Sequence, residues 1–109
     1  MEFKGVMPAI TTPFNDDLSV DHAFITRHVT WLVDHGCTGI VPLGSLGEGN
    51  TLEFEEKVEI VRTCVDALEG RVPVRPGIAS LSTAGAVALA RASAEAGCHA
   101  LMVLPPYVH

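Results

Sequence analysis

The chain has 109 residues, of which 48% are hydrophobic and 18% charged, and its formal net charge is −6. The length suits one ordinary domain, and apolar runs recur too often for an intrinsically disordered chain. The 7 Lys and Arg residues are scattered singly, which argues against nucleic-acid binding, and no apolar stretch reaches membrane-spanning length.

The first strand and helix are indicated by an apolar run and a helical pattern. Residues 6–10 predict a buried strand, and residues 15–17 have turn chemistry. Ser19 is then expected to cap a helix that ends at Gly36. Five apolar side chains fall on one face of this helix at the 3.6-residue period: Phe24, Ile25, Val29, Leu32 and Val33.

Two more strand–helix units and a last strand follow. Residues 37–43 predict the second strand, and the next helix is expected to begin at an N-cap Thr51 and to close at Gly70. Residues 72–78 predict a third strand, which two prolines make unusual. An alanine-rich helix over residues 84–96 and a fourth strand over residues 98–104 complete the pattern.

The spacing of the strands predicts the architecture. They begin near positions 6, 38, 72 and 99, which is βαβ spacing, and strict alternation implies a parallel sheet with right-handed crossovers. An open doubly wound sheet and a (β/α)8 TIM barrel both fit. A barrel takes about 250 residues, so residues 1–109 would form the N-terminal half of one barrel domain, about four β/α units, incomplete at the C-terminus. The chain stops directly after a strand, which favours this second interpretation.

The loop after the second strand carries the most chemistry. Functional residues of parallel α/β folds collect at the carboxyl ends of strands. There, Gly44 and Gly47 would leave backbone N–H groups accessible to an anion such as a carboxylate or a phosphate. Ser45 adds a hydroxyl that can pass a proton, and Glu48 is expected to hold the turn rather than act as a general base.

Other interpretations of this loop stay open. A tight turn with no ligand fits as well. The spacing GxxGxG is neither GxGxxG nor a Walker loop, so nucleotide binding is a minor alternative. Thr12 and Tyr107 also follow strands, and Tyr107 fits either a site or the rim of the core.

Metal and redox chemistry have no pattern to support them. The histidines lack metal-ligand spacing, and the three cysteines, Cys37, Cys64 and Cys98, form no CxxC pair. We expect reduced core thiols in a cytoplasmic protein, with no metal and no cofactor.

The sequence resembles the dihydrodipicolinate synthase/N-acetylneuraminate lyase family along its whole length. The most specific match is Gly44-Ser45-Leu46-Gly47-Glu48, continued by Thr51-Leu52, to the motif G-[TS]-[TS]-G-E…TL. Residues 9–14 resemble the family's first strand end, residues 71–74 its third strand, and residues 96–107 its fourth strand and PYY motif.

The resemblance implies a (β/α)8 barrel enzyme in which pyruvate or another 2-oxo acid forms a Schiff base with a lysine. It implies that Gly44, Ser45, Leu46 and Gly47 bind the substrate carboxylate. Ser45 and Tyr107 would be catalytic hydroxyls, while Thr12 and Glu48 would support the site. A homo-oligomer, dimer or tetramer, is expected.

Three departures from the family pattern bear on activity. Leu46 stands where the motif has its second hydroxyl residue, and Val108 stands where it has a second tyrosine. The resemblance implies that the lysine lies on the sixth strand and a further tyrosine on the fifth, both beyond His109. The expected function is therefore the N-terminal portion of a lyase or aldolase. The alternatives are a non-catalytic half-barrel that associates through its open sheet edges and, more weakly, a phosphate-binding α/β domain.

Overall fold

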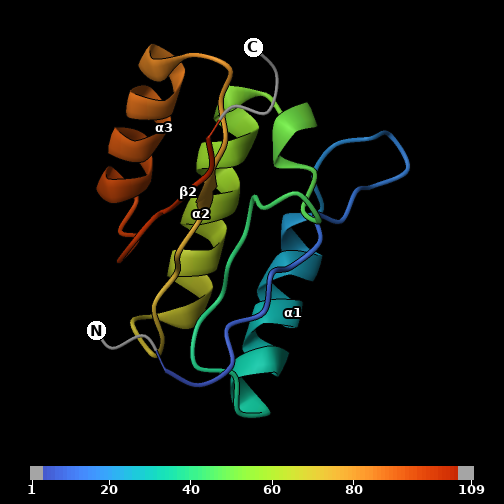
Figure 1. Cartoon of the computed structure of the whole chain (residues 1–109). Coiled ribbons are helices and arrows are strands. Elements are labelled where there is room, and N and C mark those ends of the chain that lie inside the picture. Colours follow the sequence, from blue (N-terminus) through green and yellow to red (C-terminus); the bar gives the residue numbers. More distant parts are fainter. Residues whose placement is uncertain (1–3, 106–109) are drawn as a thin grey trace.

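The computed structural model describes residues 4–105 and is shown in Figure 1. Its longest helix has 15 residues, and none of the described helices is long and apolar enough to cross a membrane. In chain order, the elements are α1 (His22–Asp34), the 3-10 turn η1 (Gly49–Thr51), α2 (Phe54–Leu68), β1 (Gly77–Ile78), α3 (Thr83–Glu95) and β2 (Met102–Val103).

Four extended segments lie side by side as a parallel sheet, in the order in which they occur along the chain. The first pairs with the second at Ala9 and Val41, and the second with the third at Ile40 and Val74. The third contains β1 and the fourth β2, which pair in parallel with Gly77 opposite Met102. The predicted strands and their parallel arrangement are confirmed.

Prolines explain why the regular ladders are shorter than the predicted strands. The Pro73 carbonyl accepts a hydrogen bond from the Ile40 N–H at 3.1 Å, and the Pro76 carbonyl accepts one from the Met102 N–H at 3.0 Å. Neither proline has an N–H to return. The third segment is thus hydrogen-bonded to both neighbouring strands. Each proline removes one hydrogen bond from the ladder on its side.

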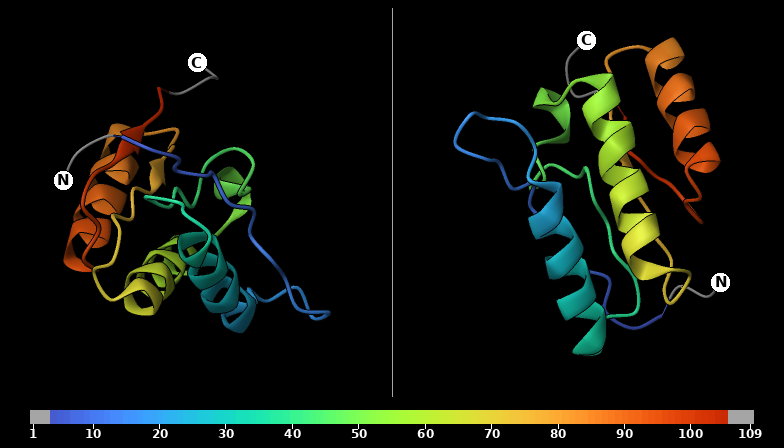
Figure 2. Two further views of the ribbon diagram at one scale, coloured as in Figure 1. Left: turned by 90° about the horizontal axis from the view of Figure 1, so that it is seen from below. Right: turned by 180° about the vertical axis from the view of Figure 1, so that it is seen from behind.

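The three α-helices lie on one face of the sheet (Figure 2). A doubly wound sheet carries helices on both faces, whereas each strand of a (β/α)8 barrel is followed by a helix on the outside. The described residues therefore form the N-terminal half of a barrel. On the opposite, inner face, Arg75 is buried and its guanidinium contacts the sulfur of Met7.

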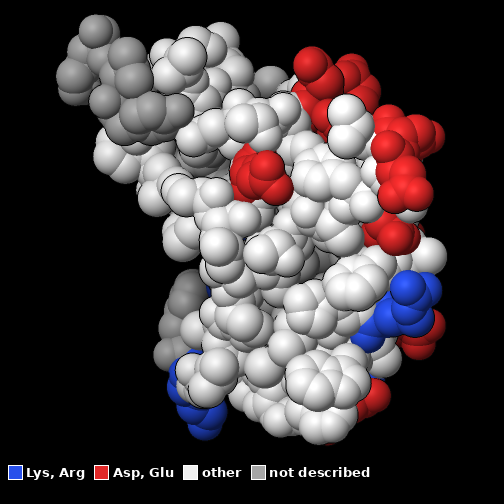
Figure 3. Space-filling model, turned by 90° about the vertical axis from the view of Figure 1, so that its right-hand side faces the viewer, with Lys and Arg blue, Asp and Glu red and all other residues white. Residues whose placement is uncertain are grey.

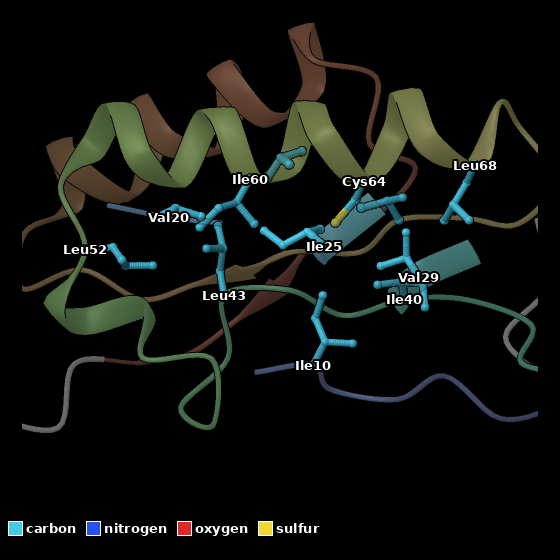
Figure 4. Packing of buried hydrophobic residues seen from close by; sticks show 12 residues of the cluster. Ile10, Val20, Ile25, Val29, Ile40, Leu43, Leu52, Ile60, Cys64 and Leu68 are labelled. Atoms are coloured by element: carbon cyan, nitrogen blue, oxygen red, sulfur yellow. The ribbon is translucent and has the colours of Figure 1, made fainter. Parts of the chain in front are cut away.

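The core lies between this sheet and helices α1 and α2 (Figure 4). Strand residues such as Ile40 and Val74 point toward the helices, and each is at most 1% exposed. Burying such apolar side chains contributes about 1.5–3 kcal/mol each. The helices contribute Ile25, Val29, Ile60, Val61, Cys64 and Leu68.

The amphipathic patterns are confirmed only in part. Ile25 and Val29 of α1 are buried as predicted, but Phe24 is 41% exposed. Phe24 instead lies beside His28 and under the Arg27 guanidinium on the outer surface. The helical period predicts which side of the helix is buried, but not where the edge of that side lies. Phe24 is at this edge and lies outside the core.

The predicted helix caps, Ser19 and Thr51, are wrong, because each helix begins two residues further along the chain. Ser19 is bonded within a hairpin, where its hydroxyl donates to Asp17 at 2.6 Å, and α1 is capped by Asp21, which accepts from the Phe24 N–H. Thr51 ends η1, and α2 begins with a capping box between Glu53 and Glu56. In both places a short turn occupies the residues before the helix.

Leu18 is strained in the hairpin over residues 15–19. Its φ is 71°, it follows a turn in which its N–H bonds to Asn15, and its side chain is 78% exposed. This is the left-handed position of a three-residue hairpin loop, where glycine is preferred. The left-handed conformation of a non-glycine residue costs about 1–2 kcal/mol. Replacement by glycine would remove this cost, but the greater freedom of glycine in the unfolded chain offsets about 0.5–1 kcal/mol of the gain.

We therefore predict that Leu18→Gly raises the free energy of unfolding by about 0.5–1 kcal/mol. Urea denaturation measures it. Leu81 is a matched control, because it is 73% exposed without a positive φ. Leu81→Gly should be neutral or destabilising; equal effects of the two changes would contradict the assignment of strain.

Burial of the Cys64 thiol makes the free energy of unfolding decrease as the pH rises above 9. Burial raises the pKa of the Cys64 thiol from 9.0 to about 12. Unfolded chains then release the proton near pH 9 while the folded chain keeps it. The contribution of the neutral, buried thiol to the free energy of unfolding is complete below pH 9. It is lost as the pH rises toward 12, at about 1.4 kcal/mol per pH unit. The free energy of unfolding of Cys64→Ala should fall less steeply with pH over this window; parallel curves would contradict it.

Candidate functional site

The loop of residues 44–47 lies between two residues in the left-handed conformation. Leu43 has a φ of 66° and is 2% exposed, and Glu48 has a φ of 58°. Such values are uncommon outside glycine, and each costs about 1–3 kcal/mol unless the surrounding structure imposes it. The second strand therefore turns sharply at Leu43, and the loop folds back over the carboxyl ends of its neighbours.

Glycines make the close packing beneath this turn possible. A Cβ atom at Gly49 would overlap the Leu43 carbonyl oxygen, and one at Gly77 would lie 2.7 Å from the same oxygen. Real Cβ atoms do not approach so closely. The Leu43 carbonyl thus lies between two backbones that only glycine allows to come this near. A Cβ atom at Gly47 would likewise lie 2.9 Å from the Ile10 carbonyl oxygen.

Thr12 links the end of the first strand to the loop. Its side chain is buried, and Oγ1 donates a hydrogen bond to the Gly47 carbonyl oxygen at 2.6 Å. The two residues are 35 positions apart in the sequence. The hydroxyl holds the peptide between Gly47 and Glu48, and so ties the loop to the end of the first strand.

Four consecutive backbone N–H groups of the loop have no acceptor among the described residues. The Glu48 N–H bonds to the Ser45 carbonyl at 3.1 Å, and the Gly49 N–H bonds to the Gly44 carbonyl at 3.2 Å. Within residues 4–105, by contrast, no backbone N–H of residues 44–47 donates to a protein acceptor. Successive N–H groups without protein acceptors are the donors from which anion-binding nests are built. We call these four residues the amide nest.

The side chains around the amide nest are few. Ser45 is exposed, and its hydroxyl bonds to no other described residue. Leu46 is 62% exposed and offers no polar group. From the fourth strand, the Cε of Met102 lies 3.8 Å from where a Cβ of Gly44 would stand, so the thioether lies over the loop.

Glu48 acts in the turn through its backbone. Its carbonyl accepts hydrogen bonds from the N–H of Thr51 and, at 2.9 Å, from the hydroxyl of Thr51. Its carboxylate is exposed and does not cap η1. A supporting role for the side chain stays a prediction.

The structure thus brings Thr12, Gly44, Ser45, Leu46 and Gly47 together at one end of the sheet. Tyr107 lies outside the described residues. Among residues 4–105 there is no group of three or more His, Cys, Asp or Glu side chains placed to hold a metal ion. Sequence reasoning missed the roles of Gly49, Gly77 and Met102, which depend on the register of the strands.

Comparison with known proteins identifies close relatives. Residues 2–109 match the Dihydrodipicolinate synthetase family. Over 105 residues the chain is 43% identical to the 4-hydroxy-tetrahydrodipicolinate synthase of Agrobacterium fabrum, covering 96% of this chain and 36% of that protein. It is 44% identical to the same enzyme of Gluconacetobacter diazotrophicus, of which it covers 35%. The chain therefore spans about a third of the length of these relatives.

Solved structures agree with the fold. The dihydrodipicolinate synthase of Bacillus anthracis superposes with a TM-score of 0.92 at 37% identity, over 98% of this chain and 37% of that one. A prophage protein of the dihydrodipicolinic acid synthase family from Escherichia coli K12, solved in complex with pyruvate, gives a TM-score of 0.94 at 30% identity. The superposition covers 98% of this chain and 36% of the prophage protein.

The packing around Leu43 predicts opposite outcomes for two glycine substitutions in one loop. Gly49→Ala places a methyl group on the Leu43 carbonyl and should lower the free energy of unfolding by several kcal/mol, beyond the about 1–3 kcal/mol of ordinary overpacking. Gly44→Ala meets only the mobile end of Met102 and should cost less than about 1 kcal/mol. Thermal denaturation of both variants measures this, and equal destabilisation would contradict the packing described.

Proposed function

Because the chain belongs to the dihydrodipicolinate synthetase family, we propose that it is the N-terminal part of a lyase or aldolase that binds pyruvate or another 2-oxo acid at the amide nest. Residues 1–109 would then be the first part of a single (β/α)8 barrel domain. The relative from Escherichia coli K12 that was solved with pyruvate supports this substrate class.

The observation that carries the proposal is the row of N–H groups at residues 44–47 that lack acceptors within the described chain. A 2-oxo acid carries a carboxylate at one end, and the amide donors of a loop that Thr12 and glycine packing hold against the sheet suit it. Hydrogen bonds to a charged group contribute about 1.5–3 kcal/mol each. The Ser45 hydroxyl adds a donor that can also pass a proton.

Met102 would contact the carbon chain of the bound acid. Its thioether lies over Gly44 on the inner face of the barrel, the face on which strand residues point toward the barrel axis. The carboxylate would thus be held by N–H groups at the loop, and the reacting carbon atoms would lie toward the axis.

The covalent step belongs to a lysine beyond residue 109. The two lysines of this chain do not suit it, because Lys4 is exposed and Lys57 lies half-buried on α2, on the outer side of the sheet. An amine nucleophile needs a lowered pKa, which desolvation in the site provides. Tyr107 would supply a hydroxyl to the proton relay, and a homo-oligomer is the proposed assembly.

Binding without covalent chemistry is the expected behaviour of the 109-residue chain. In ¹⁵N-labelled chain, pyruvate should shift the amide resonances of residues 44–47, whereas borohydride reduction with pyruvate should add no mass. Ser45→Ala should weaken binding about 2- to 10-fold, the value of one hydrogen bond. Pyruvate-induced shifts confined to other residues, or reductive labelling of Lys4 or Lys57, would contradict the proposal.

A further inference from the structure

We propose that the groove between α1 and α2 binds an aliphatic diamine, whose ammonium groups are held by two carboxylates and by His22. The two helices lie side by side on the outer face of the sheet (Figure 2), and residues of both line the groove. None of the lining residues belongs to the amide nest. The site is therefore separate from the proposed 2-oxo acid site and does not depend on it.

The groove has the size of a small-molecule site. Its volume is about 540 Å³, and both of its walls come from the described chain. Ala23 of α1 and Ala67 of α2 line it, and their short side chains leave space between the helices. Their methyl groups offer apolar surface to a chain of methylenes. An aliphatic chain with polar ends therefore suits the groove.

The hydrogen bonds of Thr63 determine the tautomer of His22. The Thr63 hydroxyl donates its single hydrogen to the Glu59 carbonyl oxygen at 2.8 Å, and its oxygen lies 2.7 Å from Nδ1 of His22. The hydroxyl can then only accept from the ring, so Nδ1 carries the hydrogen. In the neutral ring Nε2 keeps a lone pair, and it bonds to no other described residue. His22 thus gives the groove an acceptor for an N–H donor.

Two carboxylates line the groove on the side of α2. Asp66 lies in the last turn of this helix and Glu69 is its C-cap, so the two are neighbours on one face. Both are exposed, and neither forms an ion pair within residues 4–105. No Lys or Arg lines the groove. Their negative charge is therefore available to a ligand.

The position of these carboxylates opposes the electrostatics of α2. The C-terminus of a helix carries a partial negative charge, and basic side chains are preferred there. α2 has no basic residue in its last turn, and Glu69 has a φ of 49°, a left-handed conformation in which glycine is preferred. Residues that break local rules without a compensating contact are typical of functional sites. A bound cation would supply the missing positive charge.

The acceptors of the groove match the donors of a diamine. An ammonium group has three N–H donors. Nε2 of His22, one carboxylate and the hydroxyl of Thr26, which bonds to no other described residue, can accept them. The second ammonium group would pair with the other carboxylate. An α-amino acid suits the groove less well, because its own carboxylate would meet two like charges and no basic side chain.

Other parts of the surface also attract cations, so a matched position outside the groove is needed. The formal net charge is −6, and acidic side chains gather along one side of the face shown in Figure 3, where basic ones are few. Single exposed charges hold a cation weakly, and salt screens them. Glu95 is such a charge, because it is exposed in the last turn of α3 and does not line this groove.

The test titrates the ¹⁵N-labelled chain with 1,4-diaminobutane at constant ionic strength. The amide resonances of residues 22–26 and 63–69 should shift, whereas those of residues 44–47 should not. The diamine should also raise the midpoint of urea denaturation, because a ligand of the folded chain alone stabilises it. Ornithine, which is the same diamine with a carboxylate added, should bind at least about fivefold more weakly.

Three variants identify the acceptors. Asp66→Asn combined with Glu69→Gln should weaken the diamine at least about tenfold. Without ligand, the same pair should raise the urea midpoint, because it removes charges that oppose the helix dipole. His22→Asn keeps an N–H for Thr63 but removes Nε2, and it should weaken the diamine about 2- to 10-fold. Glu95→Gln should change the affinity by less than about twofold.

Two results would overturn the site. Shifts spread over the acidic surface, with equal weakening by Glu95→Gln and by the Asp66 and Glu69 changes, would mean general attraction of cations only. Ornithine that binds as tightly as 1,4-diaminobutane would contradict the assignment of a diamine. Neither result bears on pyruvate, whose binding is measured at residues 44–47.

Discussion

The carbonyl group of Leu43 is the point on which the site depends. It lies so close to the backbones of Gly49 and Gly77 that neither position has room for a side chain. This packing imposes a positive φ on a buried leucine and turns the chain back over the ends of two neighbouring strands. Strain of this kind persists only where the surrounding structure determines it. The four N–H groups that follow this turn have no acceptor among the described residues.

The half-barrel fold and the amide nest are connected through the strand ends. The first strand contributes Thr12, whose hydroxyl fixes the Gly47 peptide, and the fourth contributes Met102, whose thioether lies over Gly44. Sequential parallel pairing is what brings residues so distant in sequence together. The four residues of the nest thus come together within the described chain, whereas the proposed covalent chemistry would use a lysine beyond it.

The sequence predicted the strands, the helices and the loop, because hydrophobic period and glycine position are local signals. It placed Ser19 and Thr51 as helix caps, yet both belong to short turns that precede the helices. Hydroxyl residues suit turns and caps equally, so the pattern could not separate them. The parts played by Gly49, Gly77 and Met102 required the register between strands, which depends on contacts across 30 or so residues. Tyr107 falls outside the described residues, and its role stays a prediction.

The central claim is that backbone N–H groups of residues 44–47 bind the carboxylate of a 2-oxo acid. A crystal structure of the chain grown with pyruvate in halide-free solution tests it most directly. We expect a carboxylate within hydrogen-bond distance of these N–H groups, with the Leu43 turn unchanged. Pyruvate bound elsewhere, or a loop whose N–H groups have turned to bond within the protein, would contradict it.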